Sequence, residues 1–154
     1  MACIAASFSL TTVSCSKEET KTTTTADPRD QAVGNYNYKM VANVLVNDVI
    51  TPVDSSTGSL KVEKDAANST ILIKESTGRL FTTGSKIGVG SNGFTFDIEP
   101  QTIDTITLEG YNYFTIGTTK YHGAFISGLN TLSFAYKVTN SANGLLIVTT
   151  CTKK

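Results

Sequence analysis

The sequence predicts an all-β protein: an antiparallel meander that closes into a barrel of about eight strands, with a two-sheet β-sandwich as the alternative. Thr, Val, Ile, Phe and Tyr are frequent, whereas the 154 residues include only 3 Pro, a composition that favours strands. Apolar and polar residues alternate over short segments that are separated by turn-forming Gly, Asn, Asp and Ser clusters, as expected for hairpins. A meander of this length must protect its edges, and closure into a barrel or stacking of two sheets does so.

The folded domain is expected to span residues 27–154. Asp27 and Pro28 are typical of the N-cap and first position of a helical turn. Residues 36–46 alternate in polarity, which predicts a long, half-buried strand. Further strands are predicted at 60–63, 70–74, 80–82, 94–99, 103–108, 111–116, 120–126, 132–139 and 145–152. In the strand at 132–139, we expect Leu132, Phe134, Tyr136 and Val138 to face the interior and Ser133, Ala135, Lys137 and Thr139 to face outward.

Charge and cysteine content exclude several classes of protein. The 13 basic residues balance the 13 acidic ones, so no nucleic-acid partner is expected, because such partners require a clustered excess of Lys and Arg. No run of about 18 apolar residues is present that would predict a transmembrane helix. The cysteines at positions 3, 15 and 151 form no CxxC pair and do not resemble a disulfide framework.

Residues 1–14 are expected to be a signal peptide whose true start lies upstream. Residues 2–14 carry no charge and have the length of an apolar signal core, but the preceding basic region is missing. Val13 and Ser14, directly before Cys15, resemble the lipobox of bacterial lipoproteins. The resemblance implies cleavage before Cys15 and a diacylglyceryl-type anchor on its thiol. Two acyl chains suffice for stable attachment to a membrane, here the outer membrane.

Residues 15–26 are expected to hold the lipidated cysteine and a Thr-rich tether that has nothing large to bury. Lys17, Glu18 and Glu19 are similar to the export signal of surface lipoproteins in Bacteroidota. The resemblance implies display on the cell surface, and without export the domain would face the periplasm.

Three further segments carry a family resemblance. These are residues 27–36 (Asp-Pro-Arg-Asp-Gln-Ala-Val-Gly-Asn-Tyr), residues 123–134 (Gly-Ala-Phe-Ile-Ser-Gly-Leu-Asn-Thr-Leu-Ser-Phe) and the ending Cys-Thr-Lys-Lys at 151–154. They resemble small lipocalin-like lipoproteins of Bacteroidota, and the likeness covers most of residues 27–154. It implies a calycin-type barrel, in which Gly34-Asn35-Tyr36 stands where lipocalins carry Gly-x-Trp. An eight-stranded barrel can hold one small ligand.

No catalytic, metal-binding or cofactor-binding residue is predicted, so the protein is not expected to be an enzyme. The G-x-G-x-x-G pattern at 88–93 precedes a strand rather than a helix, which predicts a Gly-rich hairpin and not a nucleotide site. His122 is the single histidine and no G-x-S-x-G elbow is present. Cys151 is expected to be a small apolar residue. A glycosidase pair among the scattered acids Asp97, Glu99, Asp104 and Glu109 is the remaining catalytic alternative.

Tyr36, Tyr38, Phe134 and Tyr136 are predicted to face a ligand, since amphipathic Tyr side chains often line binding sites. Asp104-Thr105-Ile106 matches a short Asp-Ser/Thr-apolar pattern that is glycosylated in Bacteroidota envelope proteins, so Thr105 is a predicted O-glycosylation site.

Two non-catalytic functions follow for a lipid-anchored protein. The first is a barrel that holds a small apolar or amphipathic ligand in its interior. The second is an envelope module that binds a protein or a glycan and whose barrel is filled by its own side chains. Its binding face would include loops such as 48–59. A barrel packed with side chains, without a cavity of about 300 Å³, would argue against the first.

Overall fold

The structure, a computed structural model, describes residues 27–47, 49–66, 70–78, 80–82, 88–90, 92–103, 105–139 and 144–154. The predicted signal peptide and lipidated segment lie outside these residues. The described residues form thirteen strands and two short 3₁₀ turns, which confirms the all-β fold. The turns are η1 (Pro28–Gln31) and η2 (Ser127–Leu129). The strands are β1 (Gly34–Val46), β2 (Val49–Lys64), β3 (Ile71–Glu75), β4 (Leu80–Thr82), β5 (Gly88–Gly90), β6 (Gly93–Phe96), β7 (Gln101–Ile103), β8 (Ile106–Gly110), β9 (Phe114–Ile116), β10 (Thr119–Tyr121), β11 (Gly123–Ile126), β12 (Thr131–Val138) and β13 (Leu145–Lys153).

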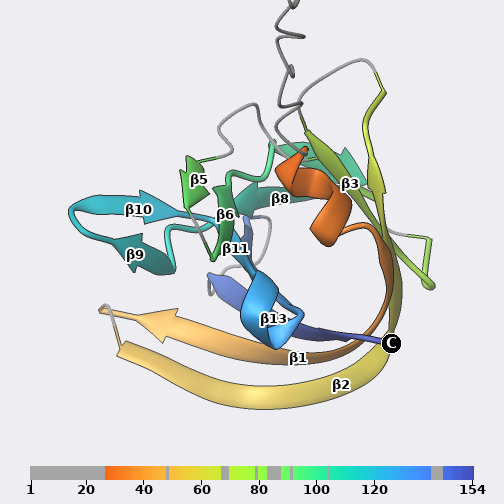
Figure 1. Cartoon of the computed structure of the whole chain (residues 1–154). Helices are drawn as coiled ribbons and strands as arrows, with labels where there is room; N and C mark the ends of the chain where they lie inside the picture. The colour runs from red at the N-terminus through yellow and green to blue at the C-terminus, as the bar shows by residue number, and fades with distance from the viewer. Residues whose placement is uncertain are drawn as a thin grey trace, which may run out of the picture.

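The main sheet is antiparallel and curls into a half-barrel (Figure 1). Its order, β4-β3-β2-β1-β13-β12-β11-β6-β5, places the first strand of the chain beside the last one. This is the architecture predicted for a lipocalin-like barrel, rather than the two stacked sheets of a sandwich. The strand number exceeds the predicted eight because the chain between β4 and β11 is divided into short hairpins. β7 and β8 form one such hairpin, and β8 also pairs with β12. β9 and β10 form a separate two-stranded sheet.

η1 begins where the sequence predicts it and ties the start of the domain to the sheet. The Asp27 side chain caps the turn by accepting a hydrogen bond from the Arg29 amide at 2.9 Å. The Arg29 guanidinium donates to the carbonyls of Asp65 and Thr70 in the connection between β2 and β3. The chain therefore enters the fold at this end of the barrel, beside η1.

β1 and β2 form a long hairpin, which corrects the prediction that the binding loop at 48–59 lacks regular structure. β2 is one continuous strand, although Pro and Asp disfavour strands. It forms because β1 offers a partner along its whole length. A register shift pairs Pro52 with Asn43 and Asp54 with Ala42, which leaves Val53 as a bulge that accommodates the proline.

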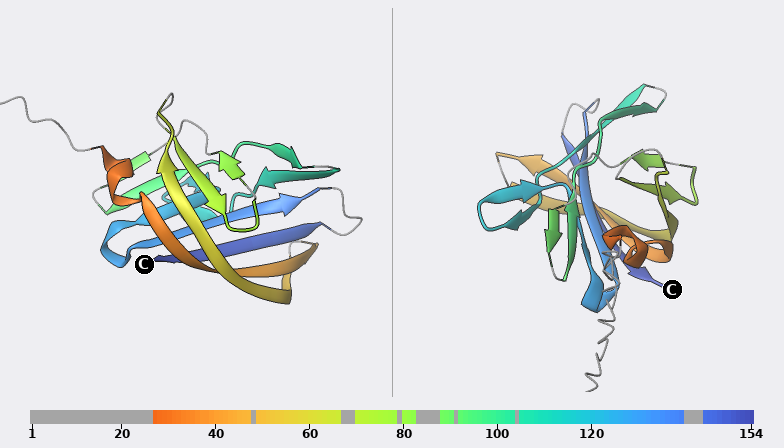
Figure 2. Two further views of the ribbon diagram at one scale, coloured as in Figure 1. Left: turned by 90° about the vertical axis from the view of Figure 1, so that its right-hand side faces the viewer. Right: turned by 45° about the horizontal axis from the view of Figure 1, so that its top comes forward.

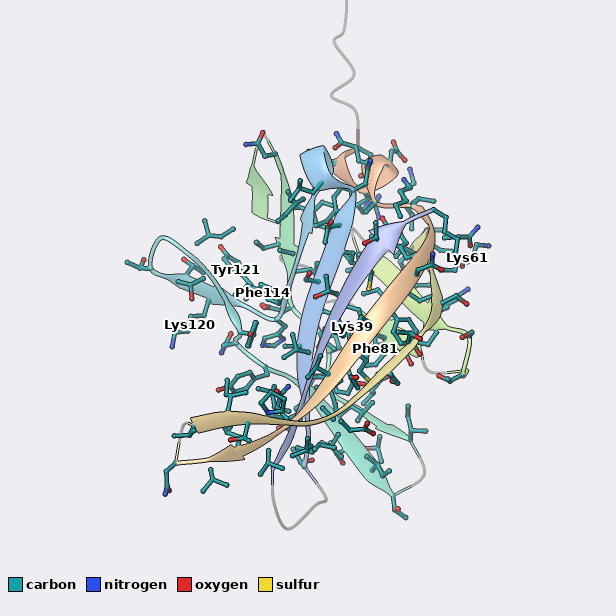
Figure 3. All side chains as sticks on the ribbon, turned by 90° about the horizontal axis from the view of Figure 1, so that it is seen from below. Lys39, Lys61, Phe81, Phe114, Lys120 and Tyr121 are labelled. Atoms are coloured by element: carbon teal, nitrogen blue, oxygen red, sulfur yellow. The ribbon has the colours of Figure 1, made fainter. Side chains whose placement is uncertain are left out.

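The core lies inside the curve of the sheet and is built from alternate positions of each strand, as period two requires. Phe81, for example, is fully buried there (Figure 3). The buried cluster includes Tyr36, Tyr38, Leu60, Val62, Ile71, Ile73, Phe81, Phe94, Phe96, Phe125, Leu132, Phe134, Tyr136, Ile147 and Cys151.

The outward face of β12 is less exposed than its sequence predicts. Leu132, Phe134 and Tyr136 are buried, as expected. On the opposite face, however, Ala135 is also fully buried. The Lys137 ammonium lies 4.5 Å from the centre of the Tyr111 ring, so this lysine is not a freely solvated residue.

Candidate functional site

Two of the four predicted ligand-facing residues meet in an aromatic cluster inside the barrel. Phe134 and Tyr136, neighbours on one face of β12, have nearly parallel rings with centroids 6.3 Å apart. The Phe81 ring of β4 lies 5.4 Å from Phe134 and 4.9 Å from Tyr136, which is contact distance for aromatic pairs. These three rings pack against one another within the buried cluster.

The other two predicted residues, Tyr36 and Tyr38, are also buried but have structural contacts. The Tyr36 hydroxyl donates to the carbonyl of Ala32 at 2.6 Å, and burial raises the pKa of Tyr36 to about 12. The Tyr38 ring lies across β2 over Gly58, where an added Cβ would come within 2.5 Å of the ring. Gly58 thus provides the space that Tyr38 occupies. Contact of any of the four residues with a ligand remains a prediction.

Two polar side chains that the sequence analysis did not select, Glu75 and Thr149, share the interior with the Cys151 thiol. Glu75 is only 5% exposed, and one of its carboxylate oxygens accepts from the Thr77 hydroxyl at 3.1 Å. Thr149 is fully buried, and its hydroxyl has no hydrogen-bond partner among the described residues. Burial, and then the nearby Glu75, raises the pKa of the Cys151 thiol, which disfavours the reactive thiolate form. The period-two pattern could have identified Glu75 and Thr149, because Glu75 lies two residues after Ile73 and Thr149 lies two residues before Cys151, on the same faces of β3 and β13 as these core residues.

His122 is a structural residue in this fold. Its Nδ1 accepts a hydrogen bond from the Ile98 amide at 2.9 Å, and its ring lies directly over Gly110, where a Cβ would collide with it. The carboxylate of Asp97 is 3.9 Å from the same nitrogen. A catalytic relay requires Nδ1–H to donate to a carboxylate. Here Nδ1 is the acceptor, so the imidazole fastens the segment after β6 to the start of β11.

A surface groove of about 360 Å³ lies on the outside of the sheet beside the C-terminus. Lys61 and Lys74 line it, but both pair with Glu63, and the pKa of Glu63 is lowered to about 2, chiefly by Lys61. Two ammonium groups share this one carboxylate, so the pairing with Glu63 does not by itself neutralise the groove. Its lining residues are Asn35, Ser59, Leu60, Lys61, Lys74, Glu75, Ser76 and Lys154.

Near the end of the β1–β2 hairpin, apolar side chains are exposed on both faces of the ribbon, which the sequence analysis did not predict. We call Val46, Val49, Ile50 and Val53 the hairpin tip, and these side chains are 41–62% exposed. Among the strands that the structure describes, none pairs with the outer edge of β2 before Leu60. The hairpin extends to the end of the barrel opposite η1 (Figure 2). An exposed strand edge that carries apolar side chains is suited to pairing with another chain.

Thr105 is exposed in the turn between β7 and β8, a position accessible to a modifying enzyme, and its glycosylation stays a prediction. Cys15, Lys17, Glu18 and Glu19 lie outside the described residues.

Within the described ranges, no group of three or more His, Cys, Asp or Glu side chains could hold a metal ion. None of the helical segments there has the length and apolar character needed to cross a bilayer. No family model matches the sequence, and no curated protein is significantly similar to it.

Proposed function

We propose that this protein is a non-catalytic lipoprotein, anchored in the outer membrane through Cys15, that binds an envelope protein through its β1–β2 hairpin. The observation that carries the proposal is the contrast between the two apolar regions of the domain. Inside the barrel, Phe81, Phe134 and Tyr136 pack against one another, whereas Val49 and Val53 of the hairpin tip are 62% and 57% exposed. Exposed apolar side chains gathered on one element are typical of binding surfaces.

The anchor is supported by the resemblance of residues 13–15 to a lipobox. We expect Cys15→Ala to abolish metabolic labelling with an alkyne-tagged fatty acid and to release the protein from the outer-membrane fraction. Cys3→Ala is the matched control, because Cys3 lies within the predicted signal peptide and should not affect labelling. Retained label in the Cys15→Ala protein would exclude the anchor.

The direction of display has a separate test. Replacing Lys17, Glu18 and Glu19 by alanine should leave lipidation intact but protect the domain from protease added to whole cells. Equal cleavage of the variant and the parent protein would exclude these three residues as the export signal.

The hairpin can be tested with a photo-crosslinking amino acid placed at Val53 in intact cells. We expect a discrete crosslinked protein adduct from this position. A probe at Thr119 is the control, because Thr119 is also exposed but lies in the separate β9–β10 hairpin. No adduct from Val53, or the same adduct from both positions, would contradict the proposal.

A second function, the carrier of a small amphipathic ligand, is favoured by one observation. The buried Thr149 hydroxyl has no partner among the described residues, and buried polar groups are normally hydrogen-bonded. A bound ligand would supply the missing partner. Native mass spectrometry of the protein, purified without denaturant, tests this function. A retained small molecule is expected if the protein is a ligand carrier, and no retained molecule is expected if it acts only by binding an envelope protein.

A further inference from the structure

The turn between β11 and β12 exposes two large aliphatic side chains at the end of the barrel where the chain enters. Ile126 is 44% exposed and Leu129, in η2, is 67% exposed. Isolated exposed apolar residues are ordinary on protein surfaces. Ile126 and Leu129 differ from such isolated residues in two respects, which are their position in the fold and the fixed backbone of the turn.

Hydrogen bonds hold η2 against its neighbours on both sides. The Ser127 amide donates to the carbonyl of Asn92 at 2.9 Å, and the Lys153 amide donates to the carbonyl of Asn130 at 3.0 Å. Asn130 ends the turn in the left-handed conformation with φ 49°. The Thr131 hydroxyl donates to the carbonyl of Leu129 itself at 3.1 Å. Leu129 is thus presented to solvent on a fixed backbone.

Lys153 joins this turn to η1. Its amide is bound to Asn130 after η2, and its ammonium donates to the carbonyl of Gln31 in η1 at 2.8 Å. η1 and η2 therefore share one end of the barrel, whereas the β1–β2 hairpin extends to the other end, and both views in Figure 2 agree on this. Asp27 is the first described residue and directly precedes η1.

The distance from the predicted anchor to this end is bounded by the covalent chain. Twelve peptide steps separate Cys15 from Asp27, and a segment of that length spans at most about 40 Å. Acylation of Cys15 would keep Asp27 within about that distance of the bilayer, and with it the end of the barrel that carries η1 and η2 close to the membrane. Under such a tether, a contact too weak to bind on its own becomes intramolecular and is favoured by the high effective concentration.

We infer that Leu129 and Ile126 insert into the lipid interface, so that the η1–η2 end of the barrel docks on the membrane that holds Cys15. This inference rests on the proposed anchor. Aliphatic side chains on a fixed turn gain affinity by leaving water for the acyl boundary. Docking orients the barrel and directs the hairpin tip away from the membrane, towards an envelope partner.

The chain contains no tryptophan, so a single introduced one reports its own surroundings. The Leu129→Trp variant would be produced as the full chain in cells and purified as the lipoprotein. It would then be reconstituted into vesicles of phosphatidylcholine and phosphatidylglycerol, prepared with and without brominated lipid. Val49→Trp is the matched control, because Val49 is 62% exposed but lies in the hairpin tip. We expect blue-shifted emission and quenching by brominated lipid for Leu129→Trp, and water-like, unquenched emission for Val49→Trp.

Two contrary results are distinguishable. If both variants remain on the vesicles and carry the acyl mass on Cys15, but Leu129→Trp emits as in water, the docking inference is overturned and the anchor stands. If the mass of the N-terminal peptide shows no acyl group and the protein fails to float with the vesicles, the proposed anchor falls and the docking inference falls with it. A matching circular dichroism spectrum for each variant and the parent protein ensures that folded protein is compared.

Discussion

Replacement of Phe134 by alanine tests the barrel core most directly. Phe134 is fully buried, and its ring contacts Phe81 and Tyr136. Truncating a buried Phe to Ala typically costs about 3–5 kcal/mol, because apolar contact is lost and a cavity remains. A domain of this kind has about 5–15 kcal/mol of total stability. We therefore expect Phe134→Ala to lower the melting temperature by roughly 10–20 °C.

Urea and thermal melts followed by circular dichroism would measure the loss. Thr150→Ala, an exposed position on neighbouring β13, is the control and should change stability by less than about 0.5 kcal/mol. Lys137→Ala is expected to cost about 0.5–1 kcal/mol, because its ammonium lies over the Tyr111 ring. Equal, small losses for Phe134→Ala and Thr150→Ala would mean that the faces of β12 are wrongly assigned, and the barrel interior with them.

Three further predictions concern the interior and the entry turn. Thr149→Val should be neutral or stabilise the fold by up to about 1 kcal/mol, because the unpartnered buried hydroxyl is removed; a clear loss in the same melts would reveal a hidden partner. A maleimide should label Cys151 at pH 8 only after unfolding in urea, because burial raises the pKa of its thiol; rapid labelling of the folded protein would contradict this. The hydrogen bond from Arg29 lowers the pKa of Asp27 from 3.8 to about 2, so its contribution is present above pH 4 and is lost as the pH falls towards 2. Asp27→Asn should therefore be less stable than the parent protein at pH 7, and pH-dependent melts of the two should converge near pH 2.

Local patterns in the sequence predicted the elements that depend on neighbouring residues. The alternation in residues 36–46 and 132–139 located β1 and β12 and placed Tyr36, Tyr38, Phe134 and Tyr136 on the buried face. Asp27 and Pro28 predicted the capped turn η1. The glycine pattern at 88–93 predicted a hairpin, and β5 and β6 pair there. Each of these signals operates over a few residues, through side-chain period, cap chemistry or turn geometry.

Long-range pairing decided the rest. Pro52, Asp54 and Gly58 disfavour strands, and they are accommodated in β2 because β1 lies alongside and a bulge lies next to Pro52. Glu75 and Thr149 became interior groups because the strands that carry them curl around one core. The placement of η2 beside η1 depends on Lys153, more than a hundred residues along the chain from Gln31. Period two assigns a side chain to one face of a strand, but which strands meet, and which face is covered, depends on contacts that no local window contains.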